Sequence, residues 1–220
     1  MIKTNATLIL ATLLACGAES PSAQQQQQRM SFFLTSVGTG KGADLGGLAG
    51  ADRHCTTLAD AVNVRNVTWR AYLSLPAAQG RAVVNAKDRI GSGPWYNSKG
   101  VLIAQNVADL HSDNSKWTKQ TVLNEKGEVV NGRGDTPNRH DILTGSQLDG
   151  TAYSGTDDTT CNAWTSSTDG SGSARVGHFD KVGGGENPTS WNSAHASRGC
   201  SQPNLVATGG DGLIFCFAIN

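Results

Sequence analysis

The sequence predicts an α+β domain with short strands, one or two helices and long loops stapled by disulfides. One segment of helical periodicity lies among segments of strand composition, and no internal repeat divides them. The 27 glycines and five phenylalanines indicate a loop-rich chain with few core aromatics. Residues 30–220 suit one domain of about 190 residues that can bury a core of its own.

The first fifteen residues indicate export. Lys3 is followed by an apolar stretch over residues 6–15, which has the length of a signal-peptide core and is too short to cross a bilayer. We therefore interpret residues 1–15 as a signal peptide. Two alternatives stay open, namely a secreted chain that is cut later, after Ala23, and an uncleaved anchor.

The next segment predicts a lipidated tether. Leu13-Leu14-Ala15-Cys16 resembles the lipobox of bacterial lipoproteins, and this resemblance implies cleavage before Cys16 and attachment of lipid to its thiol. Residues 16–29 are polar, with a glutamine run at 24–28, and such a composition cannot bury enough apolar surface to fold. We expect a lipoprotein of the bacterial outer membrane or cell surface, or otherwise a secreted or periplasmic protein.

The charge balance restricts the class of partner. The chain has 18 basic and 18 acidic residues and therefore no formal net charge. Nucleic acids and acidic membranes are held largely by net positive charge, so the composition argues against both. We predict no nucleic-acid partner, and membrane contact only through the lipid anchor.

Regular structure is predicted near the start of the domain. Residues 31–36 have strand composition, and residues 68–74 alternate bulky and polar side chains as a strand does. Between them, residues 48–62 place Ala51, Cys55 and Leu58 at helical spacing. Cys55 should therefore point inward from an amphipathic helix.

The clearest strand lies at the end of the sequence. Residues 213–219 form a nearly continuous apolar run, which is typical of a strand buried on both faces. Regular structure is sparse before it, because clusters of Gly, Asn, Asp and Ser interrupt the chain. The short candidates there are residues 101–104, 140–144, 161–166 and 175–178.

Four cysteines remain once Cys16 is set aside: Cys55, Cys161, Cys200 and Cys216. An even number in an exported chain predicts two disulfides, and the sequence by itself permits three pairings. The spacings are too long for a zinc ribbon, and neither CxxC nor HExxH occurs. We therefore predict no metal site and no cofactor.

Six blocks of sequence occur in a recognisable order: residues 50–55, 68–74, 84–88 with Trp95, 143–146, 161–164 and 214–216. They place a cysteine on a helix, an aromatic-Arg-Ala strand, an Asn-x-Lys-Asp turn and a final strand with a cysteine. Taken together, they resemble the endostatin-like branch of the C-type-lectin-like superfamily. The resemblance implies a C-type-lectin-like, endostatin-like fold and a nested pairing, Cys55 with Cys216 and Cys161 with Cys200.

The same resemblance extends to bacterial endostatin-like surface lipoproteins, which act as adhesins for matrix and serum proteins. Sugar-binding C-type lectins instead use a Trp-Asn-Asp motif to hold calcium, and here Trp191-Asn192-Ser193 lacks the carboxylate. The resemblance therefore implies an extracellular or matrix protein as partner ahead of a glycan. Arg133-Gly134-Asp135, the tripeptide that integrins read, is short enough to arise by chance.

The irregular stretch between Leu143 and Cys200 is the expected recognition surface, because loops on a rigid frame commonly carry binding residues. The candidates for ligand binding are His178, Asp180, Trp191, Asn192, His195 and Arg198. Satisfied structural residues are the alternative, and Trp191 in particular suits an anchor for the long loop.

We expect a non-catalytic binding module. No GxSxG occurs and the five histidines show no triad spacing, so no catalytic residue is assigned. The alternatives are a carbohydrate-binding lectin that needs calcium, a secreted hydrolase, and a structural envelope lipoprotein with no diffusible ligand.

Overall fold

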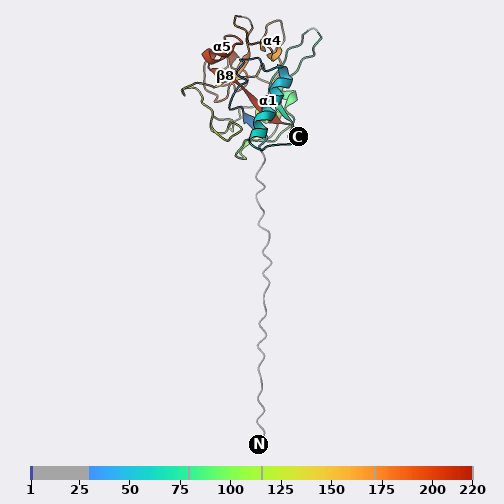
Figure 1. The fold of residues 1–220 in the computed structure, drawn as a ribbon, viewed down its shortest axis with the longest axis vertical. Helices are drawn as coiled ribbons and strands as arrows, with labels where there is room; N and C mark the ends of the chain where they lie inside the picture. Colours follow the sequence, from blue (N-terminus) through green and yellow to red (C-terminus); the bar gives the residue numbers. More distant parts are fainter. Residues whose placement is uncertain (2–29, 79, 115, 171, 220) are drawn as a thin grey trace.

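The computed structural model describes residues 1, 30–78, 80–114, 116–170 and 172–219, which include the domain in Figure 1. The predicted signal peptide, the tether and Cys16 lie outside the described residues, apart from Met1. The domain mixes short strands and few helices and is therefore of the α+β class. No helix in the described ranges is both long and apolar enough to cross a membrane.

The last strand, β8 (Gly210–Ala218), organises the main sheet. It pairs with β1 (Phe32–Leu34) along one edge, and with β2 (Trp69–Ala71) and β5 (Asp141–Leu143) along the other. Only the β5 pairing is parallel. Every residue of β8 except Asp211 is buried, which confirms the prediction of a strand covered on both faces.

The sheet continues from β5 through β6 (Arg175–His178) to β7 (His195–Ala196), and both of these pairings are antiparallel. A separate two-stranded sheet joins β3 (Trp95–Tyr96) to β4 (Leu102–Ala104). Three of the four short candidates, residues 101–104, 140–144 and 175–178, therefore contain a strand, with bounds that differ by at most one residue at either end, whereas residues 161–166 contain none.

The longest helix is α1 (Gly47–Ala61), which agrees with the prediction for residues 48–62. The others within the described ranges are shorter: α2 (Ala86–Arg89), α3 (Val107–Leu110), α4 (Cys161–Trp164) and α5 (Gln202–Thr208). All four residues of α4 have positive φ, between 47° and 64°, so this segment is a left-handed turn rather than an α-helix.

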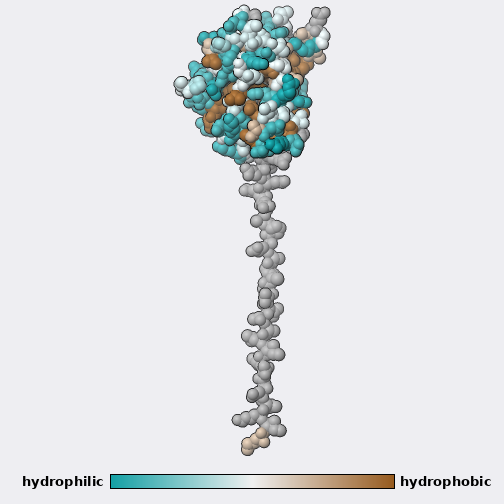
Figure 2. Space-filling model, viewed as in Figure 1, coloured by the Kyte–Doolittle hydropathy of each residue, from teal (hydrophilic) through white to brown (hydrophobic). Residues whose placement is uncertain are grey.

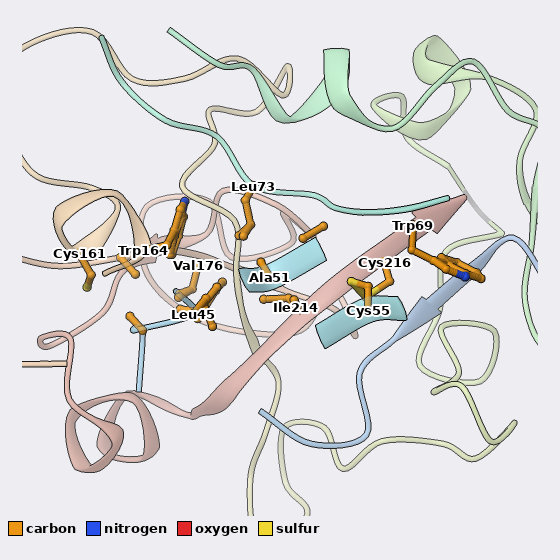
Figure 3. Packing of buried hydrophobic residues seen from close by; sticks show 14 of the residues in the cluster. Leu45, Ala51, Cys55, Trp69, Leu73, Cys161, Trp164, Val176, Ile214 and Cys216 are labelled. Atoms are coloured by element: carbon orange, nitrogen blue, oxygen red, sulfur yellow. A yellow bond between two sulfur atoms is a disulfide. The ribbon is translucent and has the colours of Figure 1, made fainter. Parts of the chain in front are cut away.

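Two clusters of buried side chains pack on the opposite faces of β8. Ile214 and Cys216 point toward α1, in the cluster of Figure 3, whereas Phe215 and Phe217 point into a cluster rich in aromatic rings. This alternation follows from the period of two along a strand. The sequence therefore fills both sides of one strand with apolar side chains and makes it the centre of the domain.

Two disulfides connect these elements. Cys55 of α1 is bonded to Cys216 of β8, and Cys161 is bonded to Cys200. The pairing is the nested one that the endostatin-like resemblance implies, and Cys55 is fully buried on the inner face of α1 as its spacing predicts. Disulfides of this kind indicate an oxidising environment outside the cytoplasm.

Candidate functional site

Three neighbouring strands bring histidine and aspartate side chains to one point. Asp141 on β5 lies opposite His178 on β6. His195 on β7 lies opposite Val176, two residues before His178 on β6. His140 directly precedes β5 and lies beside them. We call these four residues the histidine–aspartate cluster. His140, Asp141 and His178 are buried, and the side chain of His195 is 22% exposed.

The ring nitrogens of the cluster face one carboxylate oxygen. The Nε2 atoms of His140, His178 and His195 lie 3.2, 3.3 and 3.5 Å from Oδ1 of Asp141. The Nε2 atoms of His178 and His195 are 2.9 Å apart, and the rings of His140 and His178 stack at 4.3 Å between centroids. Neither carboxylate oxygen of Asp141 has an aligned hydrogen-bond donor among the described residues.

The second nitrogen of each ring contacts an oxygen on the outer side of the cluster. Nδ1 of His140 lies 3.3 Å from Oδ1 of Asp180, and Nδ1 of His178 lies 2.8 Å from the carbonyl oxygen of Pro188. Nδ1 of His195 lies 3.1 Å from the carbonyl oxygen of Ala196. All three oxygens are acceptors, so each Nδ1 is the nitrogen that donates.

The electrostatics of the cluster keep Asp141 ionised. Burial opposes ionisation of Asp141, but its interactions with His178 and His195 outweigh burial and hold its pKa below the ordinary value. Burial likewise opposes ionisation of Asp180, and the hydrogen bond from His140, helped by backbone N–H donors, lowers its pKa. The interaction with Asp141 raises the pKa of His195 against the effect of partial burial.

The chain positions these side chains by close packing of backbone. A Cβ on Gly177 of β6 would lie 1.9 Å from the carbonyl oxygen of Trp191, and one on Gly183 would lie 2.0 Å from Cε1 of His178. Glycine at both places lets the loop between β6 and β7 lie directly against the strand and the imidazole.

Two predicted site residues lie in the interior instead. Trp191 is 6% exposed and packs against Trp117, with ring centroids 4.4 Å apart, which suits the anchor role that the sequence also suggests. Asn192 is 2% exposed, and its Nδ2 donates to the hydroxyl of Tyr72 at 3.0 Å. That hydroxyl lies 2.7 Å from Nε2 of His111.

The other four predicted site residues do not all lie in one place. The structure brings His178, Asp180 and His195 together around Asp141, whereas Arg198 is exposed and its backbone N–H donates to the hydroxyl of Thr208. Arg198 therefore lies on the surface, and within the described residues no hydrogen bond or ion pair joins it to the cluster.

A polar groove runs beside the cluster on the predicted recognition stretch. It is lined by residues 111–113, Leu148, Lys181 and residues 186–192. Asp113 and Glu186 expose their carboxylates, and Lys181 forms an ion pair with Asp113 at 3.3 Å. In the view of Figure 2, hydrophobic residues are scattered among hydrophilic ones on the domain surface.

His140 and Asp141 are the cluster residues that the sequence analysis did not select. They lie in a short strand candidate, 38 and 37 positions before His178, so no local spacing connects them with it. The adjacent pair His140-Asp141 next to an apolar strand is the one local signal. Only the pairing of β5 with β6, which depends on tertiary structure, brings this pair of residues against His178.

Comparison of the sequence with protein-family models and with curated proteins finds no match in either case.

Proposed function

We propose that this protein is an extracellular, non-catalytic binding module, and that the polar groove between residues 111–113 and 186–192 is its recognition surface. One observation carries the proposal: the exposed carboxylates of Asp113 and Glu186 and the partly exposed ammonium group of Lys181 line the groove, over a base that packs against the aromatic core. A rigid base reduces the entropy lost on binding. The mixed charge suits the polar surface of a protein.

The floor of the groove supports the proposal. Trp191 contacts Trp117 and Tyr72, and Asn192 is bonded to the carbonyl oxygens of Gln147 and Leu148. These contacts fix the loop before any ligand arrives. Loops positioned by a rigid scaffold are the usual place for recognition residues.

The histidines support a non-catalytic function. Within the described ranges, no imidazole has a hydrogen bond with a serine, threonine or cysteine side chain. A nucleophile activated by histidine needs such a contact. Within the described ranges, the secreted-hydrolase alternative therefore lacks the contact between histidine and Ser, Thr or Cys on which that mechanism depends.

The surroundings of Ser193 favour a protein ligand over a calcium-dependent glycan. Its hydroxyl lies 3.0 Å from the hydroxyl of Tyr153 and accepts from Nε of Arg175 at 3.2 Å. Calcium is coordinated by six to eight oxygen ligands, among which carboxylates are prominent. A neutral hydroxyl bonded to a guanidinium is a poor place for that ion. An exported lipoprotein with this surface would act as an adhesin.

The test is capture of partners from extracellular fluid or matrix by immobilised protein, compared across two matched variants. Thr189→Arg places a long charged side chain in the groove, and Thr156→Arg makes the same change on an exposed loop outside it. We expect the wild type and Thr156→Arg to retain a protein that Thr189→Arg loses.

Equal capture by all three proteins would refute the groove as the recognition surface. Binding to a glycan array that requires added calcium would favour the lectin instead. Turnover of ester, peptide or glycoside substrates, abolished in a folded His195→Ala variant, would favour the hydrolase.

A further inference from the structure

The histidine–aspartate cluster has no explanation in the proposed binding function, because three of its four members are buried. A buried carboxylate normally accepts hydrogen bonds, and both oxygens of Asp141 lack an aligned donor among the residues described. A group of this kind needs a partner of opposite charge.

The hydrogen bonds on the outer side of the cluster decide which atoms face inward. Each Nδ1 donates its proton to an oxygen, so a neutral ring of His140, His178 or His195 presents an unprotonated Nε2. Three nitrogen lone pairs then converge on one carboxylate oxygen of Asp141. Lone pairs at 2.9 to 3.5 Å repel one another unless a proton or a metal ion lies among them.

The spacing of these atoms matches one class of cation. Zinc bonds to imidazole nitrogen and to carboxylate oxygen at about 2.0–2.1 Å in a tetrahedron, so neighbouring ligand atoms are about 3.3 Å apart. The contacts of the three Nε2 atoms with Oδ1 of Asp141 are 3.2, 3.3 and 3.5 Å. Ligand atoms of His140, Asp141 and His178 all lie within 4.8 Å of one another, and His195 adjoins this group through Asp141 and His178, at 3.5 and 2.9 Å.

The Nδ1 contacts on the outer side of the cluster are also those expected of a metal site. A histidine that binds a metal through one nitrogen usually donates the other N–H to a carboxylate or carbonyl oxygen, which fixes the ring. Asp180 and the carbonyl oxygens of Pro188 and Ala196 meet that requirement for the three rings. The partial exposure of His195 provides a route for an ion to enter.

We propose that His140, Asp141, His178 and His195 form a site for one divalent transition-metal ion of the zinc class. Three imidazoles and one carboxylate disfavour calcium and magnesium, which require oxygen ligands. His140, Asp141 and His178 form the core of the site, and His195, whose Nε2 lies 2.9 Å from that of His178, would supply the fourth ligand of a structural tetrahedron. The ion joins β5, β6 and β7 and holds both ends of the loop between residues 178 and 195.

The test uses the full chain, produced without a histidine tag under oxidising conditions so that both disulfides form. After removal of metal by a chelator, we expect calorimetric titration with zinc chloride to give one ion per chain. Free zinc at 100 times its dissociation constant should raise the melting temperature by about 5–10 °C. Cobalt chloride in place of zinc should produce the visible absorption of a four-coordinate site.

His195→Ala removes the ligand that is easiest to replace without disturbing the core, and His54→Ala removes a histidine on α1 outside the cluster. The first variant should lose more than about 100-fold in zinc affinity, beyond the effect of losing an outer partner, while the second binds as the wild type does. Near-ultraviolet circular dichroism checks that both variants fold.

Asp180→Asn provides an independent variant that leaves all four ligands in place. It weakens the hydrogen bond that orients His140 and should lower zinc affinity by about 10–100-fold. The proposal is overturned if the wild type takes up no zinc, or if His195→Ala binds one equivalent as tightly as the wild type and His54→Ala do.

Discussion

Replacing Asn192 with alanine removes a side chain that holds the base of the groove from inside the domain. Its Nδ2 lies 3.0 Å from the Tyr72 hydroxyl, and 3.0 and 3.2 Å from the carbonyl oxygens of Gln147 and Leu148. Its Oδ1 accepts from the hydroxyl of Ser190 at 3.1 Å. The two amide hydrogens and the one accepted bond amount to about three hydrogen bonds at full strength.

A typical intramolecular hydrogen bond contributes about 1 kcal/mol net to stability, so Asn192→Ala should lower the free energy of unfolding by about 3 kcal/mol. For a domain of this size, about 2–4 °C per kcal/mol gives a fall of about 6–12 °C in melting temperature. The same change at Asn187, whose Nδ2 donates once, to the carbonyl oxygen of Ser193, should cost about 1 kcal/mol.

Urea unfolding followed by tryptophan fluorescence measures both variants against the wild type. The reasoning fails if Asn192→Ala and Asn187→Ala lose equal stability, or if Asn192→Ala loses less than about 1 kcal/mol. The hydrogen bonds of Asn192 would then contribute little to stability, although its side chain is buried.

The other predictions concern the disulfides and one buried phenol. Replacing Cys55 and Cys216 by alanine opens a loop with a sequence separation of 161, which the chain-entropy account values at about 5 kcal/mol. The same change at Cys161 and Cys200, separation 39, should cost about 4 kcal/mol, and chemical unfolding should show the first pair to be the more costly. Burial raises the pKa of Tyr72 well above the usual 10.0, although the hydrogen bond from Asn192 acts to lower that pKa. The unfolded chain loses this proton near pH 10 while the folded chain keeps it, so stability should be complete below pH 10 and fall at higher pH. Absorbance at alkaline pH should show Tyr72 ionising only as the domain unfolds, and its ionisation in the folded domain near pH 10 would contradict this.

The elements predicted correctly are those whose signal is local. The helix over residues 48–62 and the final strand each carry their own hydrophobic period, and a period of 3.6 or 2 fixes which face is buried. α5 was not predicted, because seven residues are too few for a periodic pattern, even though Ser201 caps its first turn. α4 is a left-handed turn held beside the Cys161 disulfide, and composition has no signal for that conformation.

The site residues divide in the same way. His178, Asp180 and His195 were selected from their polar stretch, and the structure gathers all three. Trp191 and Asn192 were selected from that stretch too, but hydrogen bonds and ring contacts draw them into the core. The sequence does not show which members of a polar stretch point inward, because irregular backbone has no period.

The sequence by itself determined the α+β class, the oxidising environment expected from four cysteines, and the central place of residues 213–219, since composition and local period carry each of these. Only the tertiary structure decided that His140 and Asp141 lie against His178 and His195. Strand pairing over long separations chooses those neighbours, and pairing depends on how β8 and both disulfides arrange the whole chain.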